Sequence, residues 1–183
     1  PLGYRVAAFT VDGYPHRNDS AYVCHNVPGR VLGRYTLRDG RCGFLLVYTT
    51  KGQPAADAEL PAAELRNTVQ VLYKDDGWES AEVLRAMHGS TDFYSDAVSQ
   101  TQVPQWSRGR VALLGDACFC PSLMAGEGSS MAMAGAYVLA GELKRAGGDY
   151  HSAFANYQQR FKPFTDYKQR ATRSIGSFMV PRT

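Results

Sequence analysis

The segment that most constrains the fold is a short apolar run that ends in an acidic residue and leads to a glycine-flanked helix start. Residues 110–114 (Arg-Val-Ala-Leu-Leu) are typical of a strand buried on both faces of an α/β sheet. Gly115-Asp116 ends this run, and a proline-containing loop follows. Gly-Glu-Gly at 126–128 then precedes a helix that we expect from about residue 128 to 144, closed by Gly147-Gly148.

This segment has the chemistry of a ligand-binding loop. A carboxylate at Asp116 would lie where α/β sheets bind ligands, and it can accept hydrogen bonds from sugar-like hydroxyls. Gly126 and Gly128 let a ligand approach backbone amides at a helix start, where the helix dipole favours negative charge. A heterocycle that becomes anionic on reduction would be stabilised there. The residues alone also allow a simple flexible turn.

Several familiar motifs are absent from the sequence. The position of a third Rossmann glycine is Met131, no strand directly precedes Gly126, and there is no Walker A sequence. Residues 128–132 (Gly-Ser-Ser-Met-Ala) lack the closing glycine of a nucleophile elbow. Ser129 is better suited to helix capping than to nucleophilic catalysis.

The first fifty residues predict a sheet. Runs rich in β-forming residues, separated by turn signals, are expected to form strands at 4–12, 21–27, 30–37 and 41–50. In the last of these, Phe44, Leu46 and Tyr48 share one face, and the other face is also apolar, so this strand should be central. These three, with Tyr22 and Tyr35, are candidates for a substrate-facing surface. Ordinary core packing is an equal alternative.

Further helices and one more strand are expected along the chain. Residues 51–60 are expected to form a loop. Helices are expected from Pro61 to about residue 74, over 78–87, and over 149–176 with an interruption at Pro163, and a strand is expected over 92–103. In the last region aromatic residues recur at helical spacing and indicate a core or interface: Tyr150, Phe154, Tyr157, Phe161 and Phe164.

Composition narrows the class of protein. A net charge of +3 is too slight and too scattered to imply a nucleic-acid partner, and no apolar run is long enough to span a membrane. The four cysteines are Cys24, Cys42, Cys118 and Cys120. They are too few for a disulfide scaffold and lack metal-ligand spacing, so we expect free thiols, no metal and a cytoplasmic location.

The sequence also suggests a fragment. The chain starts at Pro1 without an initiator methionine. The expected helix after Gly128 carries small residues suited to close packing against another layer: Ala132, Ala134, Gly135, Ala136, Ala140 and Gly141. One short strand at 110–114 cannot cover both this helix and the last helices. We therefore expect the chain to be a fragment, or one of two associating pieces.

Residues 106–117, Pro121, Gly-Glu-Gly at 126–128 and residues 136–143 closely resemble the second flavin-binding motif of the FAD-dependent aromatic hydroxylases. These are p-hydroxybenzoate hydroxylase-like, group A flavoprotein monooxygenases. The resemblance extends to Tyr-x-x-Arg-x-x-Pro at 157–163 and, more weakly, to the first strands. It spans nearly the whole chain but corresponds only to the later half of the family's sequence.

The resemblance implies an α/β protein, α+β in this fragment. Residues 1–105 would form a mostly antiparallel substrate-binding sheet domain with helices. Residues 106–183 would form the C-terminal strand and helices of the FAD-binding domain.

The resemblance also implies a set of site residues. Asp116 would hydrogen-bond the ribityl chain of FAD, and amides near Gly128 would face the pyrimidine edge of the flavin ring. The implied FAD-binding residues are Gly115, Asp116, Pro121, Gly126, Glu127, Gly128 and Ser129. Leu123 and Met124 would approach the substrate, together with Phe44, Leu46 and Tyr48. No residue stands out as a general acid or base.

The sequence departs from the family pattern in two places. Phe119 replaces the usual histidine, and Ser122-Leu123 replace paired prolines. The family's N-terminal Gly-x-Gly-x-x-Gly half, which binds the ADP part of FAD, is absent and would be the missing partner.

The implied function is hydroxylation of an aromatic or polyketide-like small molecule with NAD(P)H and O2. The alternatives are a cyclase that uses FAD structurally and a cofactor-free binding module.

Overall fold

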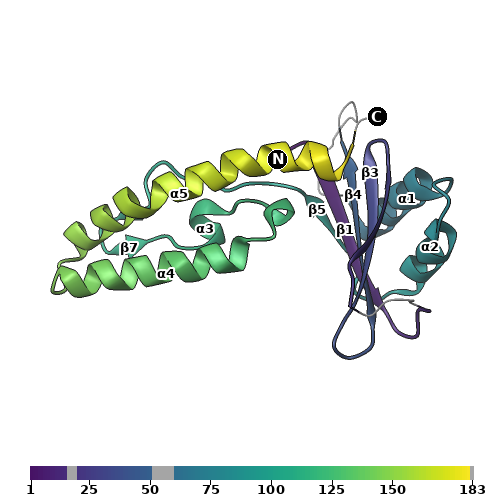
Figure 1. Ribbon diagram of the computed structural model, residues 1–183, viewed down its shortest axis with the longest axis horizontal. Helices are drawn as coiled ribbons and strands as arrows, with labels where there is room; N and C mark the ends of the chain where they lie inside the picture. Colours follow the sequence, from purple (N-terminus) through teal and green to yellow (C-terminus); the bar gives the residue numbers. More distant parts are fainter. Residues whose placement is uncertain (16–19, 51–59, 182–183) are drawn as a thin grey trace. The chain divides into compact units, whose positions relative to one another are not determined.

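The computed structural model describes residues 1–15, 20–50 and 60–181, so the loop predicted at 51–60 lies almost entirely outside the described residues. The chain forms two compact units (Figure 1). The first comprises Pro1, Gly3–Ala97 and the residues from Ser177 onward, and the second comprises Leu2 and Val98–Gly176. The expected domain boundary between residues 105 and 106 stays a prediction.

The first unit contains the predicted antiparallel sheet. Its strands are β1 (Tyr4–Val11), β2 (Val23–Val27), β3 (Arg30–Thr36), β4 (Cys42–Thr49) and β5 (Tyr94–Ala97). They lie in the order β2-β3-β4-β1-β5, every pairing is antiparallel, and β4 is central as predicted. This sheet, with helices segregated to one of its faces, confirms the α+β class.

Two helices cover one face of the sheet, α1 (Ala62–Tyr73) and α2 (Ser80–Gly89) (Figure 1). Strand register places Phe44 opposite Phe9 and Leu46 opposite Ala7, so their side chains share that face. The core between sheet and helices includes Phe44, Leu46, Tyr48, Val69, Tyr73, Val83 and Met87, all at most 2% exposed.

The expected aromatic substrate surface divides between the two faces. Gly33 and Gly43 belong to the opposite face from Phe44 by strand alternation. A Cβ at Gly33 would stand 2.0 Å from the hydroxyl of Tyr22, and one at Gly43 would stand 2.5 Å from the ring of Tyr35. The two tyrosine rings are 6.0 Å apart and therefore lie over this opposite face. The two glycines make room for them.

This division changes the interpretation of the first three candidates. Phe44 and Leu46 are 0% exposed and Tyr48 is 2% exposed, and all three pack under α1 and α2. They leave no surface for a substrate, so we assign them to the core. The alternation of the strand predicted which residues share a face, but not which face the helices cover.

Polar contacts hold α1 against the strands β3 and β4. The buried Tyr73 hydroxyl lies 3.1 Å from the Val31 carbonyl oxygen and 3.0 Å from that of Val47. Burial raises the pKa of Tyr73 well above its usual value, so the hydroxyl stays a donor. Arg30 also pairs with Asp76 just after α1.

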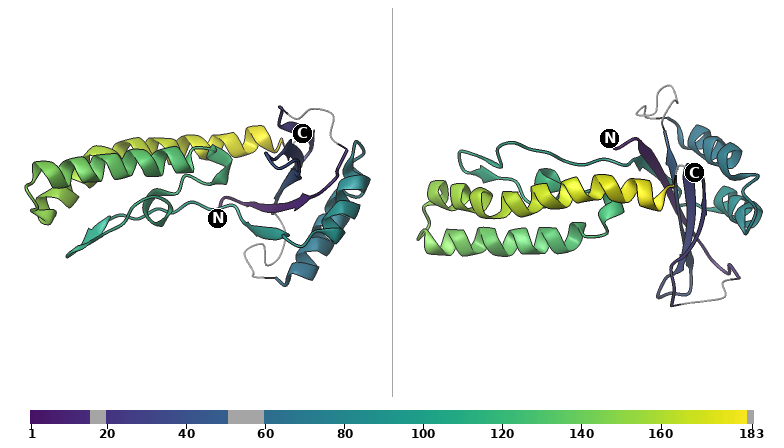
Figure 2. Two further views of the ribbon diagram at one scale, coloured as in Figure 1. Left: turned by 90° about the horizontal axis from the view of Figure 1, so that it is seen from below. Right: turned by 45° about the horizontal axis from the view of Figure 1, so that its top comes forward.

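The second unit consists mainly of helices. Its elements are the two-residue strands β6 (Ser107–Arg108) and β7 (Val111–Ala112), α3 (Asp116–Phe119), the 3₁₀ turn η1 (Leu123–Ala125), α4 (Gly128–Arg145) and α5 (Tyr150–Met179), whose last residues belong to the first unit. The helices α4 and α5 lie side by side in opposite directions (Figure 2). The predicted α4 start and its Gly147-Gly148 end are both present, and both closing glycines have positive φ.

Three predictions about this unit were wrong. The run 110–114 is not a strand buried on both faces. Only Val111–Ala112 is strand, β6 is its one partner among the described residues, and Val111 is 65% exposed. A strand is buried on both faces only where other elements cover both faces of its sheet, and within the described chain the side chain of Val111 is not covered.

The strand expected over 92–103 is limited to Tyr94–Ala97. From residue 100 onward the backbone bonds instead to other segments: the Thr101 amide donates to the Cys120 carbonyl, and the Thr101 carbonyl accepts from the Gln169 side chain. These contacts take the place of a β ladder.

The last helix is not interrupted at Pro163 but runs through it for 30 residues. Proline lacks the amide that would bond within the helix, and this usually breaks or kinks it. Here Tyr157 and Phe161 before the proline, and Thr165 and Gln169 after it, are all buried. Packing on both sides therefore holds one helix across the missing hydrogen bond.

An aromatic cluster forms the core of the second unit. The Trp106 ring lies 5.2 Å from that of Phe119 and 5.1 Å from that of Tyr157, and Trp106 is 1% exposed. Between α4 and α5, the buried Glu142 carboxylate lies 2.6 Å from Arg145 and 3.0 Å from Arg160. The predicted aromatic stripe is thus part of the core at Tyr157 and Phe161.

We predict that Tyr73→Phe lowers the free energy of unfolding by about 1 kcal/mol, because it removes the hydrogen bond of the buried hydroxyl to the backbone carbonyls of β3 and β4. Urea denaturation measures the change. Tyr137→Phe, at a side chain that is 83% exposed, is the control and should stay within about 0.5 kcal/mol. Equal stability of Tyr73→Phe and the wild type would contradict the anchoring role of this hydroxyl.

Candidate functional site

The turn after β7 directs the chain into the candidate site. Gly115 has φ +63° and ψ −139°, a conformation that favours glycine, and it precedes α3 directly. A Cβ at this position would also stand 3.4 Å from the Cβ of Ala132 on α4. The glycine therefore allows the sharp turn that places Asp116 at the start of α3 beside α4.

Asp116 lies beside the start of α4, as the sequence predicts. Its Oδ1 atom is 3.7 Å from the position that a Cβ on Gly128 would occupy. The Asp116 side chain is exposed, whereas Gly115 is buried. A carboxylate and a helix start that are twelve positions apart in the sequence therefore present themselves together at an accessible surface.

The first turn of α4 has backbone amides that can donate hydrogen bonds to a ligand. Glu127 is the N-cap residue, and no side chain caps the helix. The amides of an uncapped first turn, here at 128–130, have no partner within the helix. Ser129 is exposed and is not a cap, while the Ser130 hydroxyl donates to the Glu127 carbonyl. The helix start thus offers backbone donors to a ligand.

The predicted site residues have different exposures. Asp116, Leu123, Gly126 and Ser129 are exposed, and Glu127 and Gly128 are half-buried, whereas Gly115, Pro121 and Met124 are buried. The Glu127 carboxylate lies 2.8 Å from the ammonium of Lys168 on α5. This ion pair directs the Glu127 side chain toward α5, and the backbone of this segment remains the part that can meet a ligand.

The cysteines beside Asp116 are poor nucleophiles. Burial raises the pKa of Cys118 to about 12. Burial also raises the pKa of Cys120, and the nearby Asp116 carboxylate adds to that shift. Phe119 between them belongs to the aromatic core and packs on Trp106 and Phe161. The groups that this surface offers to a ligand are therefore the Asp116 carboxylate and backbone amides, and all four cysteines are free thiols.

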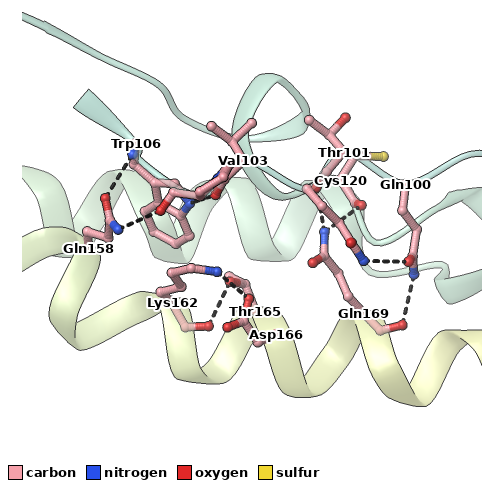
Figure 3. A network of polar contacts seen from close by, with 12 residues as sticks. Gln100, Thr101, Val103, Trp106, Cys120, Gln158, Lys162, Thr165, Asp166 and Gln169 are labelled. Atoms are coloured by element: carbon pink, nitrogen blue, oxygen red, sulfur yellow. Dashed lines mark hydrogen bonds and ion pairs between the residues drawn. The ribbon is translucent and has the colours of Figure 1, made fainter. Parts of the chain in front are cut away.

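Sequence reasoning missed a polar contact set behind the loop. On α5, Thr165, Gln169 and Thr172 are at most 5% exposed. They continue, at helical spacing, the buried side that carries Tyr157 and Phe161. The helical spacing could have predicted these buried residues, but the aromatic residues alone entered the prediction. Figure 3 shows Gln169 reaching from α5 to Thr101 and Cys120.

Two other features are absent from the described part of the chain. Among the described residues, no group of three or more histidine, cysteine, aspartate or glutamate side chains is arranged to hold a metal ion. In the same part of the chain, no helix combines the length and apolar character that crossing a membrane requires.

Comparison with known proteins identifies relatives of the whole chain. No protein-family model matches the sequence. A flavin-dependent monooxygenase from an unknown prokaryotic organism and one from Legionella longbeachae are each 43% identical over 171 residues, which are 92% of this chain and 43% of each relative. The crystal structure of tetracycline destructase Tet(55) matches with a TM-score of 0.86 at 28% identity, over 98% of this chain and 47% of that chain.

These matches confirm the family that the motif predicted. The chain is similar to part of the flavin-dependent monooxygenases, and this similarity supports an FAD-dependent aromatic hydroxylase-like family. It spans about half the length of the relatives it matches.

Thiol labelling at pH 8 should modify Cys24 first and Cys118 last. Cys24 is exposed, whereas Cys118 is buried. With a pKa of about 12, Cys118 has about a thousandfold less thiolate at this pH than a cysteine at the usual value of 9.0. Peptide mass spectrometry assigns each site, and Cys24→Ser should remove the fast phase. Early labelling of Cys118 in the folded protein would contradict this description of the site.

Proposed function

We propose that this chain forms the flavin-ring side of an FAD-dependent monooxygenase. The observation that carries the proposal is the exposed Asp116 carboxylate beside the uncapped first turn of α4. This arrangement occurs in a chain whose relatives are flavin-dependent monooxygenases. In this proposal Asp116 accepts hydrogen bonds from the ribityl hydroxyls, and the amides of 128–130 face the pyrimidine edge of the ring.

The residues present fit such a group. FAD offers hydroxyl donors on its ribityl chain and acceptor atoms on its ring, and the site offers the complementary carboxylate and amides. A Cβ at Gly126 would meet nothing within 4 Å, and the only neighbour of one at Gly128 would be the Asp116 carboxylate. The backbone here is therefore open to the close approach of a planar ligand.

The chain's own residues have binding and electrostatic roles in this proposal. Bound flavin supplies the redox chemistry with O2. The α4 dipole and its free amides stabilise negative charge on the ring, and Asp116 fixes the position of the cofactor. Leu123, which is 46% exposed, provides an apolar wall beside this backbone.

The substrate in this proposal is an aromatic or polyketide-like molecule, with NAD(P)H as the reductant. Its support is the motif resemblance and the similarity to a tetracycline destructase at 28% identity. The side chains of Tyr22 and Tyr35, on the face of the sheet opposite Phe44, replace Phe44, Leu46 and Tyr48 as the candidate aromatic surface within the first unit. The free thiols and the reductant favour a cytoplasmic location.

The proposal also includes an N-terminal half that binds the ADP part of FAD. Large apolar side chains of the second unit stand exposed, with Val111 65%, Met133 68% and Tyr137 83% accessible. Monomeric proteins rarely expose several large apolar side chains close together, and Met133 and Tyr137 lie one turn apart on α4. Since the chain spans about half of its relatives' length, we assign the cover of these side chains to that missing half.

Asp116→Ala should weaken flavin binding by about ten- to a hundredfold, because it removes a charged hydrogen-bond acceptor. Titration of flavin fluorescence against the protein at its full natural length measures the Kd. Asp75→Ala is the control, since this side chain is 84% exposed and lies in the other unit. A wild-type protein that shows no flavin absorbance and takes up no FAD would refute the proposed function and favour a cofactor-free module.

Turnover of substrate without NAD(P)H or O2 would instead favour a cyclase that uses FAD structurally. For a monooxygenase we expect NAD(P)H and O2 to be consumed in proportion to the amount of hydroxylated product formed.

Tyr137→Asp should weaken association with the N-terminal half without destabilising this chain, because the side chain is 83% exposed. Co-purification of the two separately tagged halves, followed by intact-mass analysis, measures the association. Lys144→Asp, at an exposed position beyond the apolar side chains of the same helix, is the matched control. Unchanged co-purification of Tyr137→Asp would contradict this assignment.

A further inference from the structure

A buried glutamine on α5 holds the backbone that leads into the candidate flavin loop. The side-chain amide of Gln169 donates to the carbonyl of Thr101 at 2.6 Å and to that of Cys120 at 3.1 Å. Gln100 donates to the carbonyl of Pro121 at 3.0 Å and to that of Gln169 at 2.8 Å. Figure 3 shows these contacts joining three segments that are distant in the sequence.

Two of these carbonyls, those of Cys120 and Pro121, come directly before a residue with a strained backbone. Ser122 has φ +91° and ψ 150°, a region that is populated almost only by glycine. Within the described part of the chain, only Trp78 and Ser122 have positive φ without being glycine. Ser122 is 3% exposed, and its hydroxyl accepts from the Met124 amide at 3.3 Å.

Strain of this kind persists only where the surrounding contacts determine the backbone. The Cys120 carbonyl accepts from Gln169 and also from the Thr101 amide, at 3.2 Å. The Pro121 ring fixes its own φ, and Gln100 binds its carbonyl. Both peptide groups before Ser122 are therefore fixed from outside the loop.

The direction of the chain at Ser122 determines the path of the backbone to α4. Residues 123–125 form the 3₁₀ turn, Gly126 takes the left-handed conformation at φ +64°, and α4 starts two residues later. A change in the peptide plane at Ser122 would propagate through this short path to the first-turn amides. Three hydrogen bonds, from Gln100, Thr101 and Gln169 to the carbonyls of Cys120 and Pro121, thus bear on the donors that face the proposed flavin.

We infer that Gln169 is a positioning residue for the flavin. From α5 it fixes the Cys120–Pro121 peptide, and Gln100 fixes the next peptide, directly before Ser122. In this way Gln169 helps to set the orientation in which the loop and the α4 start present their amides. This inference rests on the proposed function, because it assigns the ligand of that loop.

The same helix offers a matched comparison. Gln158 also joins α5 to the 98–106 segment, since it accepts from the Trp106 amide at 2.8 Å and donates to the Pro104 carbonyl at 2.9 Å. It has no hydrogen bond to residues 116–128 among those found in the described chain. The two glutamines therefore share a helix, a residue type and a partner segment, and differ in their contact with the loop.

The test compares Gln169→Met with Gln158→Met in the protein at its full natural length. Methionine has a similar length but no donor, so each variant removes the hydrogen bonds and keeps the volume. Hydrogen exchange measures the amides of 124–126, all three of which bond back to residues 122 and 123. Flavin titration measures the Kd, and the visible spectrum reports the polarity around the ring.

For Gln169→Met we expect about tenfold faster exchange at 124–126, about tenfold weaker flavin binding and a shifted flavin spectrum. Gln158→Met should change none of these relative to the wild type. If Gln169→Met does not fold, Gln100→Met, at a half-buried position, removes the Pro121 contact and should give the same pattern.

Unchanged exchange at 124–126 in the folded variant would overturn the inference and leave the proposed function intact. Faster exchange with unchanged flavin affinity and spectrum would overturn it as well, because the loop would then move without consequence for the flavin. A wild-type protein that binds no flavin is a different result. It refutes the proposed function itself, and it is recognised before any variant is made.

Discussion

Close packing of α3, α4 and α5 depends on one position without a side chain. A Cβ at Gly135 would stand 2.8 Å from the Phe119 ring and 3.1 Å from the Phe161 ring. Real Cβ atoms do not approach this closely, so only glycine allows the helices to meet at this separation. Trp106 completes the cluster by packing on both rings. Because α3 begins at Asp116, this contact also determines where that carboxylate lies relative to the α4 start.

The two faces of the sheet carry different sets of aromatic side chains. Alternation along β4 correctly predicted that Phe44, Leu46 and Tyr48 act together, and their partner across the sheet is the pair of helices α1 and α2. Tyr22 and Tyr35 lie over the other face, above glycines that make room for their rings. A period of two specifies which residues share a face, but the choice of face depends on where the following helices pack.

The long helix α5 changes character along one buried side. Its first half buries aromatic rings in the core, and after Pro163 the buried residues Thr165, Gln169 and Thr172 are polar. Buried polar side chains are stable when they form hydrogen bonds. Here Gln169 satisfies carbonyl groups of a segment that has no β ladder. The polar second half of α5 thus supplies the hydrogen bonds that a β ladder would otherwise give to the segment beside the candidate site.

The sequence by itself determined the elements and the chemistry of the site. Periodicity and turn residues predicted the strands of the first unit and the limits of α4, and the motif around Asp116 predicted the family and the meeting of this carboxylate with Gly128. Tertiary structure alone decided which sheet face the helices α1 and α2 cover, that α5 continues through Pro163, that 110–114 is only partly buried, and that Gln169 supports the backbone before Ser122. Local patterns report the preferences of neighbouring residues. These four outcomes depend on contacts between segments that are distant in the chain, which no local pattern encodes.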